Sequence, residues 1–302
     1  MSGPVVLAGG TGGAKLARGM LDLAGADLTV IANTGDDIEI YGAYVSPDPD
    51  LVTFWLADRI DERGWGLRDD TFAVMDGLRE LGVDVWFSLG DRDLAIGIER
   101  ARRLADGARL TDALTELTAA LGVSARVLPM SDEPVRTWVR RRTHWTPFQE
   151  FMIRDGAAGP VEQTQFRGIG NARPTPEVLD AVASASAIVI GPSNPVISIG
   201  PILQVPEMRQ ALLDSPAPIV AVSPLVGGAV LKGPTEAFLD WAGHATSTAG
   251  IAECYAGLID GLVADEPVDG LPVLQTDTLM SDAASRRRLA TETLRFAGGL
   301  AA

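Results

Sequence analysis

Four glycines interrupt an apolar run near the start of the chain, and a helical pattern resumes directly after them. The run is Val5–Ala8, and the glycines stand at positions 9, 10, 12 and 13. A loop without Cβ atoms brings backbone N–H groups close to a ligand, and the following helix adds the positive end of its dipole. The segment predicts a phosphate or diphosphate site at Gly10, Thr11, Gly12 and Gly13. A tight turn without a ligand is the alternative.

The residues after the glycines exclude two well-known phosphate-binding loops. A Walker A loop places glycine, lysine and a hydroxyl residue in sequence, whereas Ala14 separates Gly13 from Lys15 and Leu16 follows. A dinucleotide-binding GxGxxG loop needs a third glycine where Lys15 stands. Lys15 is instead a candidate for neutralising the bound anion.

Carboxylates gather in two short segments that follow each other closely. Asp36 and Asp37 come after an apolar run, and Asp48 and Asp50 open a predicted helix. Paired carboxylates suit Mg²⁺ or the orientation of a nucleophile. Capping of the helix by Asp48 or Asp50 is the alternative, because a side-chain oxygen can accept the first N–H groups of a helix.

Two further polar loops follow apolar runs. The first contains Ser193 and Asn194 between prolines, and the second contains Gly227, Gly228 and Lys232. Rigid polar loops can hydrogen-bond a base or a phosphate at little ordering cost, although ordinary turns have the same composition. Three such loops at three strand ends predict a nucleotide with more than one phosphate.

Composition narrows the class of protein. The formal charge of −15 over 302 residues argues against a nucleic-acid partner. Positive groups for an anion must therefore be local, and the candidates are Lys15, Arg18, Arg92, Lys232 and the run Arg140–Arg142, which as a charge run is more readily a solvated face. One cysteine and two histidines make a disulfide or a His/Cys zinc site implausible. Without an apolar run of roughly 20 residues or a secretory signal, we expect a cytoplasmic protein with no membrane partner.

The elements that position these residues alternate along the chain. The predicted strands are Val5–Ala8, Leu28–Ala32, Val83–Phe87, Ala187–Ile190, Ile219–Val222 and Leu262–Ala264. The predicted helices are Leu51–Ile60, Asp70–Leu81, Leu94–Leu104, Leu110–Leu121, Pro176–Ala183, Thr248–Leu258 and Ser281–Phe296, the last ending before Gly298. This alternation predicts an α/β fold with a doubly wound, mostly parallel Rossmann-like sheet, whose ligand sits at the carboxyl ends of the strands.

One region breaks the alternation. Between about residues 126 and 170, the segments Thr137–Val139, Phe148–Ile153 and Val161–Phe166 resemble antiparallel strands. We expect an inserted helical and antiparallel lobe over the site. Residues 1–302 then form a single α/β domain that carries this lobe.

Taken together, the motifs resemble the 2-phospho-L-lactate transferase family of coenzyme F420 biosynthesis, often called CofD. The matching motifs, in chain order, are Gly9–Leu16, Asn33–Asp37, Ser46–Asp50, Leu89–Ala95, Leu128–Asp132, Gly191–Pro195 and Leu225–Gly228. The resemblance implies transfer of a phospholactyl or phosphoenolpyruvyl group from a guanosine diphosphate conjugate to the deazaflavin Fo, with release of GMP. It also implies Mg²⁺ and a homodimer.

The resemblance implies a role for each motif. The diphosphate lies on Gly10–Gly13 and Ser193–Asn194, and the guanosine reaches toward Gly227 and Gly228. Asp36 is the first choice for Mg²⁺, with Asp37 or Asp48 as the second carboxylate. Asp50 and Arg92 match positions associated with the deazaflavin, so Asp50 could hold or deprotonate the attacking hydroxyl. An ion pair between Arg92 and Asp91 or Asp93 is the alternative for Arg92.

The chain departs from the family pattern where Ile96 and Gly97 replace a common Thr-His pair. A CofD-like regulator that binds a nucleotide sugar without transferase activity is the first competing hypothesis. A nicotinamide-dependent dehydrogenase is the second, and it is disfavoured by Lys15 and by the lack of an acid/base histidine at a strand end.

Overall fold

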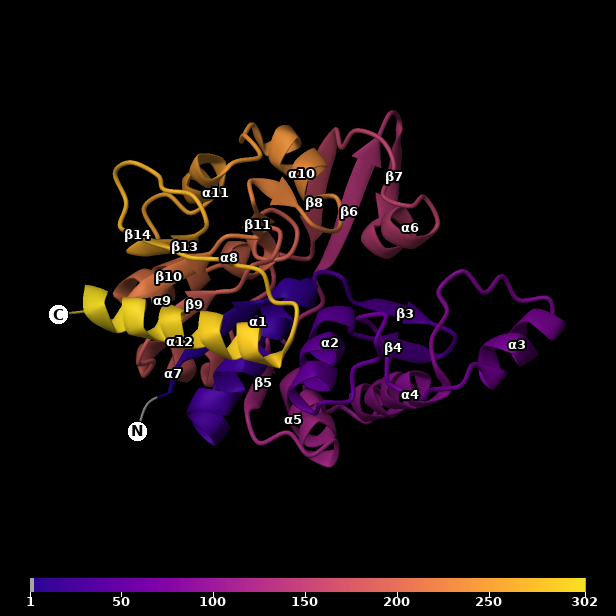
Figure 1. Ribbon diagram of the computed structural model, residues 1–302. Helices are drawn as coiled ribbons and strands as arrows, with labels where there is room; N and C mark the ends of the chain where they lie inside the picture. The colour runs from indigo at the N-terminus through magenta and orange to yellow at the C-terminus, as the bar shows by residue number, and fades with distance from the viewer. Residues whose placement is uncertain (1–2, 302) are drawn as a thin grey trace.

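The centre of the molecule is a parallel sheet of seven strands. The computed structural model describes residues 3–301, and Figure 1 shows the sheet with helices on both of its faces. The spatial order is β14-β13-β10-β9-β1-β2-β5, and every neighbouring pair is parallel. The strands are β1 (Val5–Ala8), β2 (Thr29–Ala32), β5 (Arg126–Pro129), β9 (Ile188–Ile190), β10 (Ile219–Val222), β13 (Gly261–Ala264) and β14 (Val273–Gln275). The predicted fold class is confirmed.

The strand order reverses once. The chain adds β2 and β5 on one side of β1, then crosses and adds β9, β10, β13 and β14 on the other side. After β1 and β9, the chain turns to opposite faces of the sheet, and in open α/β sheets ligands bind at the carboxyl ends of the strands at such a point. This switch point is where a ligand is expected.

Helices cover the sheet on two faces. Three helices pack on one face: α1 (Gly10–Ala24), α2 (Pro47–Leu56) and α12 (Ala283–Leu300). Four pack on the other: α7 (Pro176–Ala183), α8 (Gly200–Gln204), α9 (Met208–Asp214) and α11 (Thr248–Cys254). The remaining helices are the 3₁₀-helix Gly25–Asp27, α3 (Ala73–Glu80), α4 (Asp91–Ala105), α5 (Leu110–Ala120), α6 (Phe148–Ile153) and α10 (Thr235–Ala242). No helix in residues 3–301 has the length and apolar character needed to cross a bilayer.

Three small antiparallel sheets surround this body. They are β3 (Ile38–Ile40) with β4 (Ala43–Val45), β6 (Arg136–Arg141) between β7 (His144–Pro147) and β8 (Gln163–Arg167), and β11 (Leu225–Val226) with β12 (Ala229–Val230). The sheet β7-β6-β8 and α6 stand above the carboxyl edge of the central sheet in Figure 1.

The lobe differs from its prediction in two places. Its expected first residues, Arg126–Pro129, form the edge strand β5, because their buried apolar side chains pair beside β2. The predicted strand Phe148–Ile153 is wrong: the segment is α6. Phe148 and Phe151, three residues apart, both pack against Phe238, and that spacing is helical.

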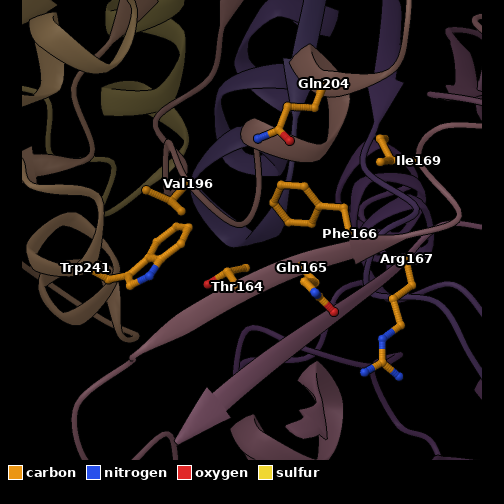
Figure 2. A pocket seen from close by; sticks show the side chains of 8 residues that line it. All are labelled: Thr164, Gln165, Phe166, Arg167, Ile169, Val196, Gln204 and Trp241. Carbon is orange, nitrogen blue, oxygen red and sulfur yellow. The ribbon is translucent and has the colours of Figure 1, made fainter.

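A hollow of about 520 Å³ separates β8 from the loop that follows β9. In Figure 2, Thr164 and Phe166 point from β8 toward Val196 and Gln204, while Arg167 points away. Alternate side chains of a strand point to opposite sides. The hollow therefore lies on one side of the lobe sheet, with Trp241 at its rim.

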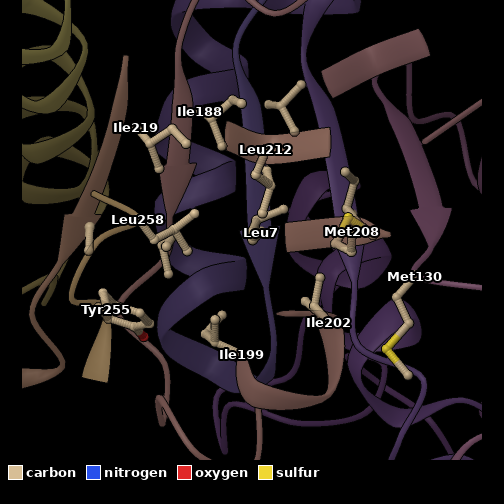
Figure 3. Close-up of a cluster of buried hydrophobic side chains, with 14 of the residues drawn as sticks. Leu7, Met130, Ile188, Ile199, Ile202, Met208, Leu212, Ile219, Tyr255 and Leu258 are labelled. Atoms are coloured by element: carbon tan, nitrogen blue, oxygen red, sulfur yellow. The ribbon is translucent and has the colours of Figure 1, made fainter. Parts of the chain in front are cut away.

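The core around the central sheet consists of two clusters, one on each face of the sheet. Val5 and Leu7 of β1 face one cluster, while Val6 and Ala8 face the other. Figure 3 shows Leu7, Ile188 and Ile219 from three neighbouring strands beside Met208 and Leu212 of α9. Because both faces are covered, the strands consist of continuous apolar residues, which made them recognisable in the sequence.

Two further predictions are wrong. Val83–Phe87 is not a strand, because Val85 and Phe87 pack in a local cluster with Met75 and Leu94 beside α3 and α4. The last helix does not end before Gly298 but continues to Leu300, because Leu294, Ala297 and Leu300 extend its contact with the core. Helices α8, α9 and α10 and strands β3, β4, β7, β11, β12 and β14 were not anticipated.

Helices α1 and α12 touch at a glycine. A Cβ atom at Gly19 would overlap the carbonyl oxygen of Arg286 and lie 3.3 Å from the Cβ of Ala290. Backbone atoms cannot move aside as a flexible side chain can. The contact fixes α12 against α1 along the face that carries the glycine-rich loop.

We expect Gly19→Ala to lower the free energy of unfolding by about 1–3 kcal/mol through overpacking. Gly77→Ala is the matched control, since Gly77 lies inside α3 with open space around it. That control should be neutral or stabilising by up to about 1 kcal/mol. Urea unfolding of both variants makes the comparison, and equal stability of the two would contradict the tight crossing.

Candidate active site

The loops after β1 and β9 meet at the switch point. A Cβ atom at Gly12 would overlap the carbonyl oxygen of Pro192, and one at Gly13 would lie 3.0 Å from the Oγ of Ser193. The N–H of Gly13 donates to Ser193 Oγ at 3.2 Å. These glycines are therefore required by the approach of one loop to the other. The close approach also joins two predicted diphosphate-binding segments.

The first turn of α1 supplies backbone donors at this switch point. Gly10 has a φ of +66°, and its N–H donates to Asp48 Oδ1 at 2.6 Å. The N–H groups of Thr11 and Gly12 have no acceptor among residues 3–301. The helix N-terminus thus holds one carboxylate and retains two N–H groups that can bind an anion.

Asn33 connects the two acidic segments, a role that the sequence reasoning missed. Its Nδ2 donates to Asp48 Oδ2 at 2.9 Å, and its Oδ1 accepts from the N–H of Gly35 at 2.7 Å. Asn33 directly follows β2, so its position at the carboxyl edge could have suggested such a role. The amide fixes Asp48 beside the loop that carries Asp36.

Three buried carboxyl groups have raised pKa values. Burial is the main cause for each, lifting the pKa of Asp36 well above its ordinary value, that of Asp37 to about 7 and that of Asp48 to about 6. The Asp48 charge raises the pKa of Asp36 further. Asp36 Oδ1 and Asp37 Oδ2 are buried without a hydrogen-bond partner in the described part of the chain. The cluster therefore favours a proton or a cation.

Asp50 lies in a different setting, paired with a fully buried arginine. Both Arg100 nitrogens, Nη1 and Nη2, donate to the Asp50 carboxylate, and Nη1 also donates to the carbonyl oxygen of Tyr44 at 2.9 Å. Sequence reasoning missed Arg100. Leu94, Gly97 and Arg100 follow one another at intervals of three residues, and this spacing indicates that Arg100 lies on the buried face of α4.

Arg92 is exposed at the first turn of α4 and forms no ion pair within residues 3–301, so its expected alternative partners do not bind it. Asp91 instead accepts from the N–H of Val74 at 2.9 Å and so caps α3. Asp70, before α3, accepts from the N–H of Arg92 at 2.9 Å and caps α4. The two helices exchange their capping carboxylates.

The departure at Ile96 and Gly97 has a structural reason. A Cβ atom at Gly97 would lie 3.0 Å from the Cβ of Ala43 in β4. Helix α4 packs closely on β4 there, so a histidine side chain has no room at this position.

The pair Gly227–Gly228 forms the turn of the β11–β12 hairpin. The two residues have φ angles of +58° and +71°, which glycine adopts without strain. The turn geometry accounts for both glycines. The hairpin nevertheless stands at the carboxyl edge after β10, and the Gly227 N–H donates to the Asp265 carboxylate.

Lys15 lies among other cations. Its Nζ donates to the carbonyl oxygen of Met280 at 3.2 Å and lies 5.7 Å from the centroid of the Trp55 ring. Burial, and then the charges of Arg286 and Lys232, lower the pKa of Lys15. Three of the other candidate cations are neutralised: Arg18 pairs with Asp22 and Asp58, Arg140 pairs with Glu162, and Arg141 pairs with Asp155.

A cavity of about 210 Å³ adjoins the acidic cluster. It runs from the strand-end residues beneath the lobe, and its lining includes Asp36, Asp37, Arg136, Trp138, Phe148 and Gln149. Aromatic walls with a few polar groups suit a flat heterocycle. Arg136, Trp138 and Gln149 were not identified from the sequence because they belong to the lobe.

Comparison with known proteins gives a consistent result. A model of the family described as 2-phospho-L-lactate transferase CofD matches residues 5–285. The chain is 38% identical over 297 residues to a 2-phospho-L-lactate transferase of Methanosarcina mazei, covering 95% of this chain and 97% of the relative. It is 42% identical over 270 residues to a phosphoenolpyruvate transferase of Kitasatospora aureofaciens, covering 86% and 84%.

A solved structure shares the fold. A protein of the UPF0052 family from Bacillus halodurans superposes with a TM-score of 0.61 at 17% identity, covering 96% of this chain and 99% of that one. At this identity the similarity concerns the fold alone.

We expect ionisation of the acidic cluster to destabilise the fold. The pKa of Asp37 is about 7 when folded against an ordinary 3.8, so the folded state holds this proton more tightly. The free energy of unfolding should then fall as the pH rises from about 4 to about 7. Asp37→Asn removes this cost, and its Tm advantage over the unmodified protein should grow by at least about 2 °C between pH 5 and pH 8. A constant difference across that range would be evidence against the raised pKa.

Removal of only one partner of the Asp50–Arg100 ion pair should lower the free energy of unfolding. Arg100→Met leaves a buried carboxylate unpaired and should lower the free energy of unfolding by about 3–5 kcal/mol. The double variant Arg100→Met with Asp50→Leu should recover most of this loss. Urea unfolding of the full double-mutant cycle measures the coupling, and additive effects would mean that the two groups do not interact.

Proposed function

The chain belongs to the 2-phospho-L-lactate transferase family of coenzyme F420 biosynthesis and is a transferase, and from this premise we propose its donor, acceptor and catalytic groups. The donor is a guanosine diphosphate conjugate carrying a phospholactyl or phosphoenolpyruvyl group. The acceptor is the deazaflavin Fo, and GMP is released. The observation that carries the proposal is that the N–H donors at the start of α1, an unneutralised acidic cluster and an aromatic-lined cavity meet at one sheet edge.

The diphosphate is proposed to lie at the switch point. The N–H groups of Thr11 and Gly12 stand without acceptors there, and Asn194 Nδ2 is buried without a partner among residues 3–301. Lys15 and Lys232 add positive charge nearby. In a chain with a net charge of −15, these local donors and cations supply what a diphosphate requires.

Asp36 and Asp48 are the pair that best fits Mg²⁺. Asp36 Oδ1 is an orphaned buried oxygen, and the charge of Asp48 acts on the same group. Within residues 3–301 no group of three or more His, Cys, Asp or Glu side chains is arranged around a metal. Mg²⁺ sites commonly combine one or two carboxylates with substrate phosphates and water, so this pair is sufficient. When bound, the ion would neutralise charge that develops on the transferring phosphate.

The acceptor is proposed to occupy the cavity of about 210 Å³ beneath the lobe. Its terminal ribityl oxygen attacks the β-phosphorus, and a new O–P bond forms. The bond between the β-phosphorus and the bridging oxygen breaks, so GMP leaves with that oxygen. The hydroxyl proton passes to a carboxylate at the cavity wall.

Asp37 is better suited to accept that proton than Asp50. Its pKa of about 7 lies near neutral pH, and its Oδ2 has no partner in the described part of the chain. Both oxygens of Asp50 accept hydrogen bonds from Arg100, so neither is left open toward the acceptor hydroxyl. We propose that Asp50 positions the site, that Arg92 reaches the deazaflavin, and that the chain acts as a homodimer.

Mass spectrometry of reactions with Fo, Mg²⁺ and either the lactyl or the enolpyruvyl donor tests the function. A phosphodiester product with release of GMP is expected from one donor. Asp36→Asn should lower turnover by about 100-fold or more, because it removes a preorganised charge at the transferring phosphate. Asp76→Asn, on the exposed helix α3, is the control and should be fully active. Absence of product with both donors would refute the proposed reaction.

A further inference from the structure

A carboxylate at the carboxyl end of β13 has one oxygen in use and one without a partner. Asp265 directly follows β13, and it accepts the N–H of Gly227 on Oδ2. Its Oδ1 is buried and has no hydrogen-bond partner among residues 3–301. Such an atom is costly to leave unsatisfied, so it marks a place where a donor from another molecule can bind.

The surroundings hold this carboxylate in place. Gln275 Nε2 of β14 donates to the backbone carbonyl oxygen of Asp265 at 3.0 Å. The hairpin turn at Gly227 fixes one side-chain oxygen, and none of the ion pairs in the described part of the chain involves Asp265. The strand and the hairpin therefore hold the Asp265 carboxylate in place as a hydrogen-bond acceptor that has no ion-pair partner in the described part of the chain.

The position suits the base of the proposed donor. Strand β13 is two strands from β9, whose loop carries Ser193 and Asn194. Neighbouring strands are about 4.8 Å apart, so Asp265 lies roughly 10 Å along the edge from the proposed diphosphate site. An extended nucleoside covers a distance of this order between its phosphate and the far edge of its base.

The two ends of the sheet edge between the glycine-rich loop and Asp265 differ in charge. Lys15 lies in the first turns of α1, directly after the glycine-rich loop, and its Nζ donates to the carbonyl oxygen of Met280. Asp265 and Glu266 stand at the β13 end, with Glu266 Oε1 3.3 Å from the Cβ position of Gly228. Phosphates belong at the cationic end, which leaves the acidic end for a group that donates hydrogen bonds.

We infer that Asp265 binds the guanine base through its N1–H and its exocyclic amino group, an assignment that rests on the proposed guanosine diphosphate donor. Guanine carries these two donors side by side, and a carboxylate accepts both. Adenine presents an acceptor at N1 beside its amino group, so it offers a carboxylate one donor where guanine offers two. Asp265 is thus a specificity-determining residue for the donor nucleotide.

Calorimetric titration with GDP, IDP and XDP tests the inference. The unmodified protein should bind GDP about 10-fold more tightly than IDP, which lacks the exocyclic amino group. Asp265→Asn keeps an acceptor for the Gly227 N–H but offers a donor amide toward the base. It should weaken GDP binding roughly 10- to 100-fold and strengthen XDP binding, because xanthine carries a carbonyl oxygen where guanine carries the amino group. Asp269→Asn removes an exposed charge from the loop after β13 and should leave GDP affinity unchanged.

The possible outcomes distinguish a wrong donor nucleotide from a wrong role for Asp265. Failure of the unmodified protein to bind GDP would refute the guanosine donor itself. Tight GDP binding that Asp265→Asn does not alter would overturn the role of Asp265 and leave the donor intact. If the variant does not fold, the unmodified protein decides the question, since equal affinity for GDP and IDP excludes a contact to the amino group.

Discussion

The approach of the β1 loop to the β9 loop is the constraint on which the site depends. Gly12 lacks the Cβ atom that would collide with the Pro192 carbonyl oxygen, and the Gly13 N–H donates to Ser193, so the two loops are in contact at the switch point of the sheet. This contact sets the entry angle of α1, and through it the position of the Asp48 carboxylate that caps the helix. Asn33, in the loop after β2, donates to the Asp48 carboxylate and so fixes Asp48 relative to that loop. Backbone packing thus arranges the acidic cluster before any ligand binds.

The acidic cluster opposes the stability of the fold that holds it. Asp36, Asp37 and Asp48 are buried close together, and desolvation raises the pKa of each. Nearby Asp50 avoids this cost because Arg100 neutralises it. The four carboxylates of these two neighbouring segments are therefore satisfied to different degrees. Both oxygens of Asp48 accept hydrogen bonds, whereas Asp36 and Asp37 each keep a buried oxygen without a partner in the described part of the chain.

The sequence predicts the parts of this molecule that depend on local pattern. Strands β1, β2, β9, β10 and β13 are continuous apolar runs, and the glycine-rich loop is recognisable from composition alone. Partners that depend on tertiary structure escaped prediction. Arg100 meets Asp50 across 50 residues of chain, and Arg136 reaches the cavity only through the fold of the lobe. In the lobe, the helical spacing of Phe148 and Phe151 was outweighed by their β-forming side chains.

The exchange of caps between α3 and α4 makes the folding of these helices a single event. Asp70 satisfies the N-terminus of α4, and Asp91 satisfies that of α3. Neither helix keeps its cap once the other unravels, so residues 70–105 are a candidate cooperative unit, with amide protons that exchange together. Arg92, in the first turn of α4, belongs to this unit and moves with it when the segment opens. An insertion between the two helices is tolerated only if it preserves the distance between both carboxylates and their partner helices.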